Sequence, residues 1–511
     1  MALSRIRTLT LVGLEGHVVD IEVDIAEGLP SYTLLGLPDT ALTESRDRVR
    51  SALVNSGYTW PNRRVIVSLS PAWLPKKGSN FDLPIAIALL VATGEVSQEQ
   101  CGDIIFLGEL GLDGSLRFVR GVLPTLLSAT KQGFEKSVIP SANRGEGNLV
   151  RTMQSVSASS LSSVVAFLTH GEHGDKESQQ TSSTEEFSRE SHLDLLDVVG
   201  QKSARYASEI SAIGAHHILF VGPPGTGKTM LAERIPTILP PLSHERALEV
   251  SAIHSVAGIL GERGALSTLP PFISPHHTTT APAMVGGGSH MVRPGAVSLA
   301  HEGILFVDEA PECASGVLDS LRQPLESGLV TISRASGTVI YPANFLLVLA
   351  ANPCPCGKYT GRGRGCKCSS VQIRRYLQKL SGPLLDRIDI RTFVEAPTRA
   401  EMASDIFGES SAVVRARVIA ARDSSRERYQ GCSWSLNSRI PPRELRGRFT
   451  AEKSAMAFLH MELDSERLSA RGFHKVLRLA WSVADQNGHT VPTKEDTEIA
   501  YLLREGMDIL Q

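Results

Sequence analysis

Eight residues near the middle of the chain have the composition of a phosphate-binding loop. Residues 218–221 form a short apolar run, and the octapeptide after it matches G-x-x-x-x-G-K-[S/T]. In such a loop the glycines let backbone N–H groups surround phosphate oxygens, a lysine reaches the terminal phosphates, and a hydroxyl ligates Mg²⁺. The sequence therefore predicts a site for a nucleoside triphosphate and magnesium, formed by Gly222, Pro223, Pro224, Gly225, Thr226, Gly227, Lys228 and Thr229.

Two adjacent carboxylates follow a second apolar run about eighty residues later. Residues 304–307 read as a buried strand, and Asp308 and Glu309 stand at its carboxyl end, where open α/β sheets bind ligands. We expect Asp308 to hold the magnesium ion and Glu309 to polarise the attacking water. A third run, 345–350, ends near Asn352, whose amide could position the same water; a turn-forming asparagine before a proline is the alternative.

Four of the seven cysteines fall within fifteen residues. The segment 351–368 reads ANPCPCGKYTGRGRGCKC, so Cys354, Cys356, Cys366 and Cys368 form two C-x-C pairs. Four thiolates at short paired spacings favour a structural zinc ion, which would hold the loop between the pairs as a rigid protrusion. A redox pair and unligated thiols are the alternatives, because C-x-C is tighter than the usual C-x-x-C spacing.

The same region is basic in a chain whose formal net charge is only −2. No acidic residue occurs between Ser327 and Leu385. A basic run of this kind is expected of a surface that contacts a nucleic-acid backbone, with a solvated face or a subunit interface as the alternative. The run contains Arg334, Lys358, Arg362, Arg364, Lys367, Arg374, Arg375 and Lys379.

A β-hairpin and a mobile loop are predicted in two further segments near these motifs. Residues 330–345 alternate as two strands around a Ser-Gly pair, which predicts a β-hairpin with Arg334 near its tip. Residues 275–303 are rich in Gly, Pro, His and Thr and favour a mobile loop rather than a core element. Their spacing fits no metal site for the three histidines, His276, His277 and His290.

The elements that must position these residues can be placed by composition. The 511 residues, 42% hydrophobic and 21% charged, suffice for two or three packed domains. Residues 171–192 have almost no apolar side chains and predict a flexible linker. We expect an α+β domain over 1–170, an α/β region over 193–398 with the cysteine-rich basic insertion at 353–369, and a helical domain over 399–511. No apolar run is long enough for a signal peptide or a membrane span, which predicts a cytoplasmic protein.

In this order the motifs resemble those of AAA+ ATPases, and specifically of the magnesium-chelatase-like proteins of the ComM or YifB family. The resemblance spans nearly the whole chain. The quoted motifs are DVVGQ (197–201), GPPGTGKT, ILFVDE, the strand before Asn352, SGPLLDRIDI (381–390) and LSARGFHKVLRLA (468–480). It implies an α/β P-loop AAA+ core with a C-terminal helical lid, ATP and Mg²⁺ as ligands, and a homo-hexameric ring with nucleotide between subunits.

The resemblance also implies roles for single residues and for the whole protein. Asn352 resembles the sensor-1 residue, Arg387 the arginine finger offered to the neighbour's γ-phosphate, and Arg471 the sensor-2 arginine of the lid. The hairpin 330–345 resembles the pre-sensor hairpin that lines the pore of helicase-type members. The implied activity is that of an ATP-driven helicase that migrates branched DNA in recombination, with natural transformation as one setting.

Two other functions stay open. A chelatase-type or protein-remodelling ATPase that works with a partner protein shares the same core. An ATP-binding scaffold without turnover is the other, and the presence of Glu309 and Arg387 argues against it.

The N-terminal segments 74–90 and 108–130 are similar to the Lon-protease-like, ribosomal-S5-like fold, in which a serine and a lysine form a catalytic dyad. In this chain the serine position falls on Asn80 and the lysine position near Leu123. Because the activated pair is missing, we expect a non-proteolytic domain.

Overall fold

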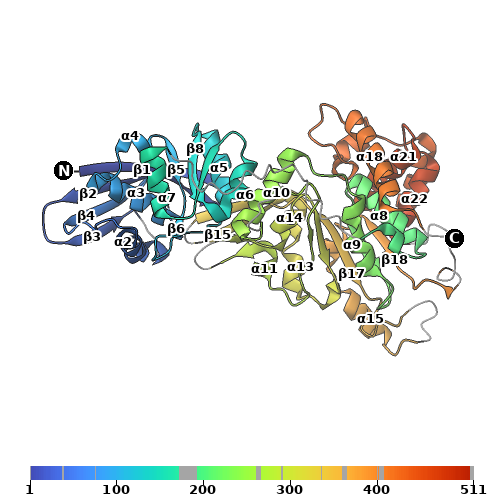
Figure 1. Ribbon diagram of the computed structural model, residues 1–511. Coiled ribbons are helices and arrows are strands. Elements are labelled where there is room, and N and C mark those ends of the chain that lie inside the picture. Colours follow the sequence, from blue (N-terminus) through green and yellow to red (C-terminus); the bar gives the residue numbers. More distant parts are fainter. Residues whose placement is uncertain are drawn as a thin grey trace.

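The computed structural model shows a chain with a mixed α/β organisation from end to end. In Figure 1 the blue N-terminal sheet lies at one end and the orange and red C-terminal helices at the other. Among the described residues no helix combines the length and apolar character needed to cross a membrane. The structure describes residues 2–36, 40–74, 76, 78–171, 193–260, 266–288, 292–334, 337–359, 365–399, 401 and 408–506.

Several sequence predictions fall outside these ranges. The predicted linker 171–192 lies outside the described residues except for Gly171. His290, Arg362 and Arg364 also lie outside them.

The N-terminal part is a seven-stranded sheet. β1 (Ala2–Val12) and β2 (Glu15–Ala26) pair antiparallel along their length, and the alternate residues Val19, Ile21 and Val23 of β2 are fully buried. The buried face packs against the apolar helix α3 (Asp82–Thr93). The other strands are β3 (Ser31–Leu35), β4 (Arg64–Ser70), β5 (Ile104–Phe106), β8 (Lys136–Pro140) and β9 (Gln154–Ala158), and the other long helices are α2 (Ser45–Asn55), α5 (Val122–Lys131) and α7 (Leu161–His170).

The central part is a five-stranded sheet in which every described pair is parallel. Its three middle strands, 304–307, 346–351 and 218–221, are apolar throughout because both faces are covered: Phe220 and Phe306 belong to one buried cluster, Leu219 and Leu305 to the other. The strand order is β11 (Phe272–Ile273), β14 (Ile304–Val307), β17 (Leu346–Ala351), β10 (Ile218–Val221) and β18 (Ile390–Phe393).

The C-terminal part contains helices and no strand among its described residues. Together with α8 (Lys202–Gly214) and α9 (Lys228–Ile238), these helices cover one face of the central sheet. Trp481 is buried there and its indole N–H donates to the carbonyl of Phe449 at 2.9 Å. The helices are α18 (Ser411–Arg428), α19 (Pro442–Leu445), α20 (Lys453–Asp464), α21 (Ala470–Asn487) and α22 (Lys494–Glu505).

The prediction of a mobile loop over 275–303 was wrong for its described residues. Met284 and Val297 lie in the core cluster on one face of the central sheet. Apolar side chains are scattered among the glycines and prolines here, and the elements are too short to show a period. They are α11 (Ala281–Val285), β12 (Gly286–Gly287), β13 (Arg293–Pro294) and α12 (Ala296–Leu299).

The hairpin prediction agrees with the structure. β15 (Leu329–Arg334) pairs antiparallel with β16 (Gly337–Pro342), and Arg334 lies opposite Gly337 beside the tip. The turn between β1 and β2 contacts this hairpin, since a Cβ built on Gly13 would lie 3.0 Å from Val339 Cγ1. The β1–β2 turn therefore packs against the hairpin.

Candidate nucleotide-binding site

The loop that joins β10 to α9 needs its glycines. Gly225 and Gly227 have φ of +77° and +87°, a region that side chains rarely tolerate. A Cβ on Gly222 would lie only 2.2 Å from the carbonyl oxygen of Val394. The backbone shape predicted from the motif is thus present, and it opens at the carboxyl edge of the sheet.

Lys228 joins this loop to the next strand. Its ammonium donates to the carbonyl oxygens of Gly222 at 2.7 Å and Pro223 at 2.8 Å, and to Asn352 Oδ1 at 3.3 Å. Burial lowers the pKa of Lys228. The lysine and the asparagine predicted from separate motifs therefore meet, because β10 and β17 are neighbours in the sheet.

The predicted magnesium ligands also meet. The Thr229 hydroxyl donates to Asp308 Oδ2 at 2.8 Å, and Asp308 Oδ1 accepts from the Glu309 N–H at 2.8 Å. A hydroxyl beside a carboxylate offers the oxygen ligands that Mg²⁺ prefers. Glu309 itself has a left-handed backbone with φ of 47°, which is costly for a residue with a side chain.

Sequence reasoning missed one neighbour of Glu309. His277 Nδ1 lies 3.3 Å from Glu309 Oε2. His277 follows β11, which pairs with β14, so both side chains come from adjacent strand ends. In the sequence, the only indication of this contact was that His277 follows the apolar pair Phe272–Ile273 by a few residues.

The two predicted arginines lie together but away from this loop. Arg387 forms an ion pair with Glu326, and Arg471 forms one with Asp386. Both arginines line a cavity of about 1030 Å³, and no residue of 222–229 lines it.

This cavity is strongly cationic. Burial alone would raise the pKa of Asp389, but the Lys475 ammonium at 2.6 Å, together with His216, holds it well below the usual range. Among the described lining residues, eight cations outnumber four acidic residues, Glu302, Glu326, Asp386 and Asp389. The cations are Arg246, Arg387, Arg422, Arg426, Arg439, Arg471, Lys475 and Arg478. A site with this balance suits an anion brought from outside the chain.

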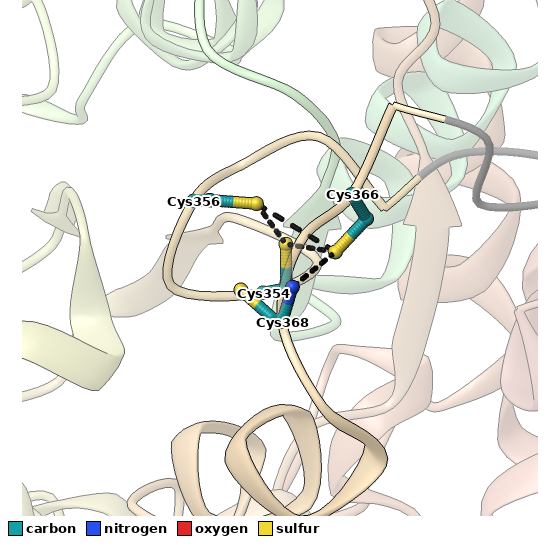
Figure 2. A group of neighbouring side chains, drawn as sticks. All are labelled: Cys354, Cys356, Cys366 and Cys368. Carbon is teal, nitrogen blue, oxygen red and sulfur yellow. Dashed lines mark hydrogen bonds between the residues drawn. The ribbon is translucent and has the colours of Figure 1, made fainter.

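The four predicted cysteines form one cluster, and their side chains gather around one point (Figure 2). Cys354 Sγ lies 3.4 Å from Cys356 Sγ and 3.6 Å from Cys366 Sγ, and the four ligand atoms lie within 4.8 Å of one another. These separations exceed the roughly 2.05 Å of a disulfide. Four sulfurs about 2.3 Å from a tetrahedral zinc would be about 3.8 Å apart. The cluster could therefore bind a metal ion.

A serine and a lysine lie close to Asn80 in the segment 74–90, and each has a partner other than the second residue. The Ser79 hydroxyl bonds to Glu109, and the Lys76 ammonium bonds to the carbonyl of Pro71. Leu123, at the lysine position, is fully buried. That the domain is non-proteolytic stays a prediction.

Family models for the magnesium chelatase subunit ChlI match three parts of the chain. "Subunit ChlI of Mg-chelatase" matches residues 21–143, "Magnesium chelatase, subunit ChlI" matches 194–402, and "Magnesium chelatase, subunit ChlI C-terminal" matches 408–504.

Full-length relatives were also found. An uncharacterized protein of Mycobacterium tuberculosis is 45% identical over 99% of both chains. YifB of Escherichia coli is 40% identical over 99% of this chain and 97% of its own. The competence protein ComM of Haemophilus influenzae is 40% identical over 96% and 94%. A Lon protease of Mycolicibacterium smegmatis is 29% identical over 27% of this chain and 18% of its own.

Proposed function

The chain belongs to the YifB and ComM family of magnesium-chelatase-like AAA+ ATPases, and from this we propose that it is an ATP-driven motor that moves branched DNA. We further propose that it works as a homo-hexameric ring, with domains at 1–170, 193–398 and 399–511. In this proposal the last domain is the C-terminal helical lid and the first has the ribosomal-S5-like fold.

The observation that carries the DNA proposal is a basic surface beside the ATP site. Six described cations of the acid-free run 327–385 are exposed. In one of them, Lys379, the Nζ atom lies 3.4 Å from Oε2 of Glu312, a carboxylate outside the run. Two of them lie on α15 (Ser370–Leu377), the helix that follows the cysteine loop (Figure 1). Such a surface attracts the phosphates of DNA regardless of base sequence. Five of the six make up this basic surface, on and around the cysteine-rich insertion and α15: Lys358, Lys367, Arg374, Arg375 and Lys379. The sixth, Arg334, lies on the hairpin strand β15.

In this proposal the chain's residues divide the work of hydrolysis. Lys228 holds the terminal phosphates, and Thr229 and Asp308 hold magnesium, which would neutralise charge that develops on them. Glu309 takes the proton of the attacking water, and Asn352 positions that water. Arg387 and Arg471 then act on the nucleotide of the neighbouring subunit.

We also propose zinc as the metal of the cysteine cluster. Purified protein should carry about one zinc per chain, and Cys354→Ser with Cys356→Ser should release it, because half of a tetrahedral site is lost. Elemental analysis of protein prepared without chelators measures the ratio. Cys432→Ser, outside the cluster, is the control and should keep the metal. Metal-free wild-type protein would contradict the zinc proposal.

The DNA proposal is tested by the ATPase rate with and without forked, four-way and linear DNA. We expect the branched substrates to stimulate hydrolysis most. If none of the three stimulates it, the protein-remodelling alternative is favoured instead.

Two triple alanine variants test whether the basic surface contacts DNA. Replacing Lys367, Arg374 and Arg375 by alanine should weaken DNA binding and reduce the slope of log K against log salt by up to about 0.9 per contact. Basal hydrolysis should persist. A control with the same loss of charge replaces Arg443, Lys453 and Lys494, which are exposed on the C-terminal helices. Equal DNA binding by both triple variants would contradict a contact at the basic surface.

A further inference from the structure

The backbone next to the cysteine cluster touches the phosphate-binding loop directly. Gly357, which follows Cys356, is buried with φ of +71°. A Cβ at this position would lie 2.4 Å from Pro224 Cδ and 2.7 Å from Pro224 Cγ. Only a glycine therefore allows the backbone beside the cysteines to lie against the proline ring of the loop.

The residues just before the cysteines also contact the phosphate-binding loop. The N–H of Gly222 donates to the carbonyl of Ala351 at 3.1 Å, and Asn352 Oδ1 accepts from Lys228 at 3.3 Å. Two residues later the chain reaches Cys354, whose carbonyl accepts from the Gly357 N–H at 2.9 Å. Residues 351–357 thus form an arc that contacts the start, the middle and the lysine of the phosphate-binding loop.

The second pair of cysteines anchors this arc to a helix. Cys366 and Cys368 lie just before α15, which begins with a capping box at Ser369. The Sγ atoms of Cys354 and Cys356 each lie 3.6 Å from Cys366 Sγ. A metal ion bound by all four thiolates would therefore fix the arc, including Gly357, against the phosphate-binding loop.

We propose that metal binding at the four cysteines controls the affinity of the nucleotide site. This inference rests on the proposed zinc site and extends it from a support of the basic loop to a regulator of ATP binding. The ligand class is a thiophilic divalent cation, for which zinc is the probe. With the metal bound, the arc keeps the phosphate-binding loop preorganised; without it, the loop must be ordered at the expense of binding free energy.

The first experiment uses wild-type protein. Zinc is removed with a chelator, the chelator is dialysed away, and magnesium is restored before a fluorescent ADP analogue is titrated. We expect the Kd to rise about tenfold on zinc removal and to return on zinc addition. Unchanged affinity in protein shown to be zinc-free would overturn the proposal. Failure to find or load zinc would instead overturn the zinc site itself, so the two failures are distinguishable.

The second experiment separates the contact from the metal. In Gly357→Ala the added methyl cannot fit against Pro224, whereas all four thiols remain. We expect full zinc content with nucleotide affinity reduced by about tenfold. Gly365→Ala is the matched control, since a Cβ in this position of the same loop would meet nothing closer than 3.9 Å. Wild-type affinity in a zinc-replete Gly357→Ala protein would overturn the proposed route, and the wild-type zinc titration decides the question if that variant does not fold.

Discussion

In the proposed mechanism, hydrolysis depends most on Glu309. Glu309→Gln should keep nucleotide affinity, because Lys228, Thr229 and Asp308 are untouched, but hydrolysis should fall about 10² or more since the water loses its base. Titration of a fluorescent nucleotide and steady-state phosphate release measure the two steps. Glu312→Gln, three residues away on the surface, is the control and should hydrolyse normally. Wild-type turnover in Glu309→Gln would exclude Glu309 as the base.

Single residues differ in how far the sequence could predict them. Lys228 and Thr229 belong to one contiguous motif, so their positions follow from it. His277 beside Glu309 and Gly357 against Pro224 could not be foreseen, because each contact joins segments that are distant in sequence. Such contacts depend on which strands are neighbours in the sheet, and apolar runs alone do not determine that order.

The junction between α8 and β10 lies just before the strand that leads into the phosphate-binding loop. It also contacts the segment that contains Arg387, because the His217 carbonyl accepts from the Asp389 N–H. His216 is buried there, and its Nε2 lies 2.8 Å from the Ser482 hydroxyl on α21. The adjacent His217 accepts the Leu347 N–H of β17 at 3.1 Å. Burial lowers the pKa of both histidines, that of His217 to about 4, although Asp389 nearby acts in the opposite direction and Lys475 in the same one.

This junction should make the protein sensitive to mild acid. Below about pH 6.5 the unfolded chain takes up protons on these histidines while the folded chain does not, so stability should fall as pH drops from 7 toward 4. Asp389, whose pKa is lowered, loses its stabilising charge only at more acidic pH, which is the same direction in a later window. His216→Gln should flatten the pH dependence of the thermal unfolding midpoint between pH 7 and 5, and the exposed His244→Gln should not. An unchanged slope in His216→Gln would contradict this assignment.

At the level of helices and strands, sequence patterns succeeded where a run was apolar and continuous. The strands that precede the phosphate-binding loop, Asp308 and Asn352 were all predicted, because burial on both faces leaves only apolar residues in them. The two-residue strands within 275–303 were not, since two residues show no alternation. The cysteine cluster was predicted from spacing alone, and metal binding by it stays a prediction.

The whole molecule presents its nucleotide site and its arginine pair on different surfaces. Lys228 lies at the carboxyl edge of the sheet, whereas Arg387 and Arg471 line the cationic cavity, which contains no residue of the phosphate-binding loop. Each arginine is held at the cavity by a carboxylate, Glu326 or Asp386. In the proposed ring, an arginine held there would meet a γ-phosphate brought by another subunit. The resemblance of Arg387 to a finger was available from sequence, but the placement of Arg471 beside Asp386 required the fold.

Mixed rings test whether these arginines act between subunits. Lys228→Ala should abolish nucleotide binding, and Arg387→Ala should bind nucleotide but hydrolyse it poorly, so each variant alone should be nearly inactive. In an equal mixture, half of the sites keep Lys228 and half of their neighbours offer Arg387, so the ATPase rate should recover to about a quarter of the wild-type rate if subunits assort randomly. Arg471→Ala mixed with Lys228→Ala should recover in the same way, because Arg471 lies beside the finger segment. The double variant Lys228→Ala with Arg387→Ala, mixed with Arg387→Ala, is the control and should stay inactive since it supplies no finger. If mixtures assemble, as judged by their size in solution, yet neither pair recovers activity, the arginines act within their own chain and the cavity serves another anion.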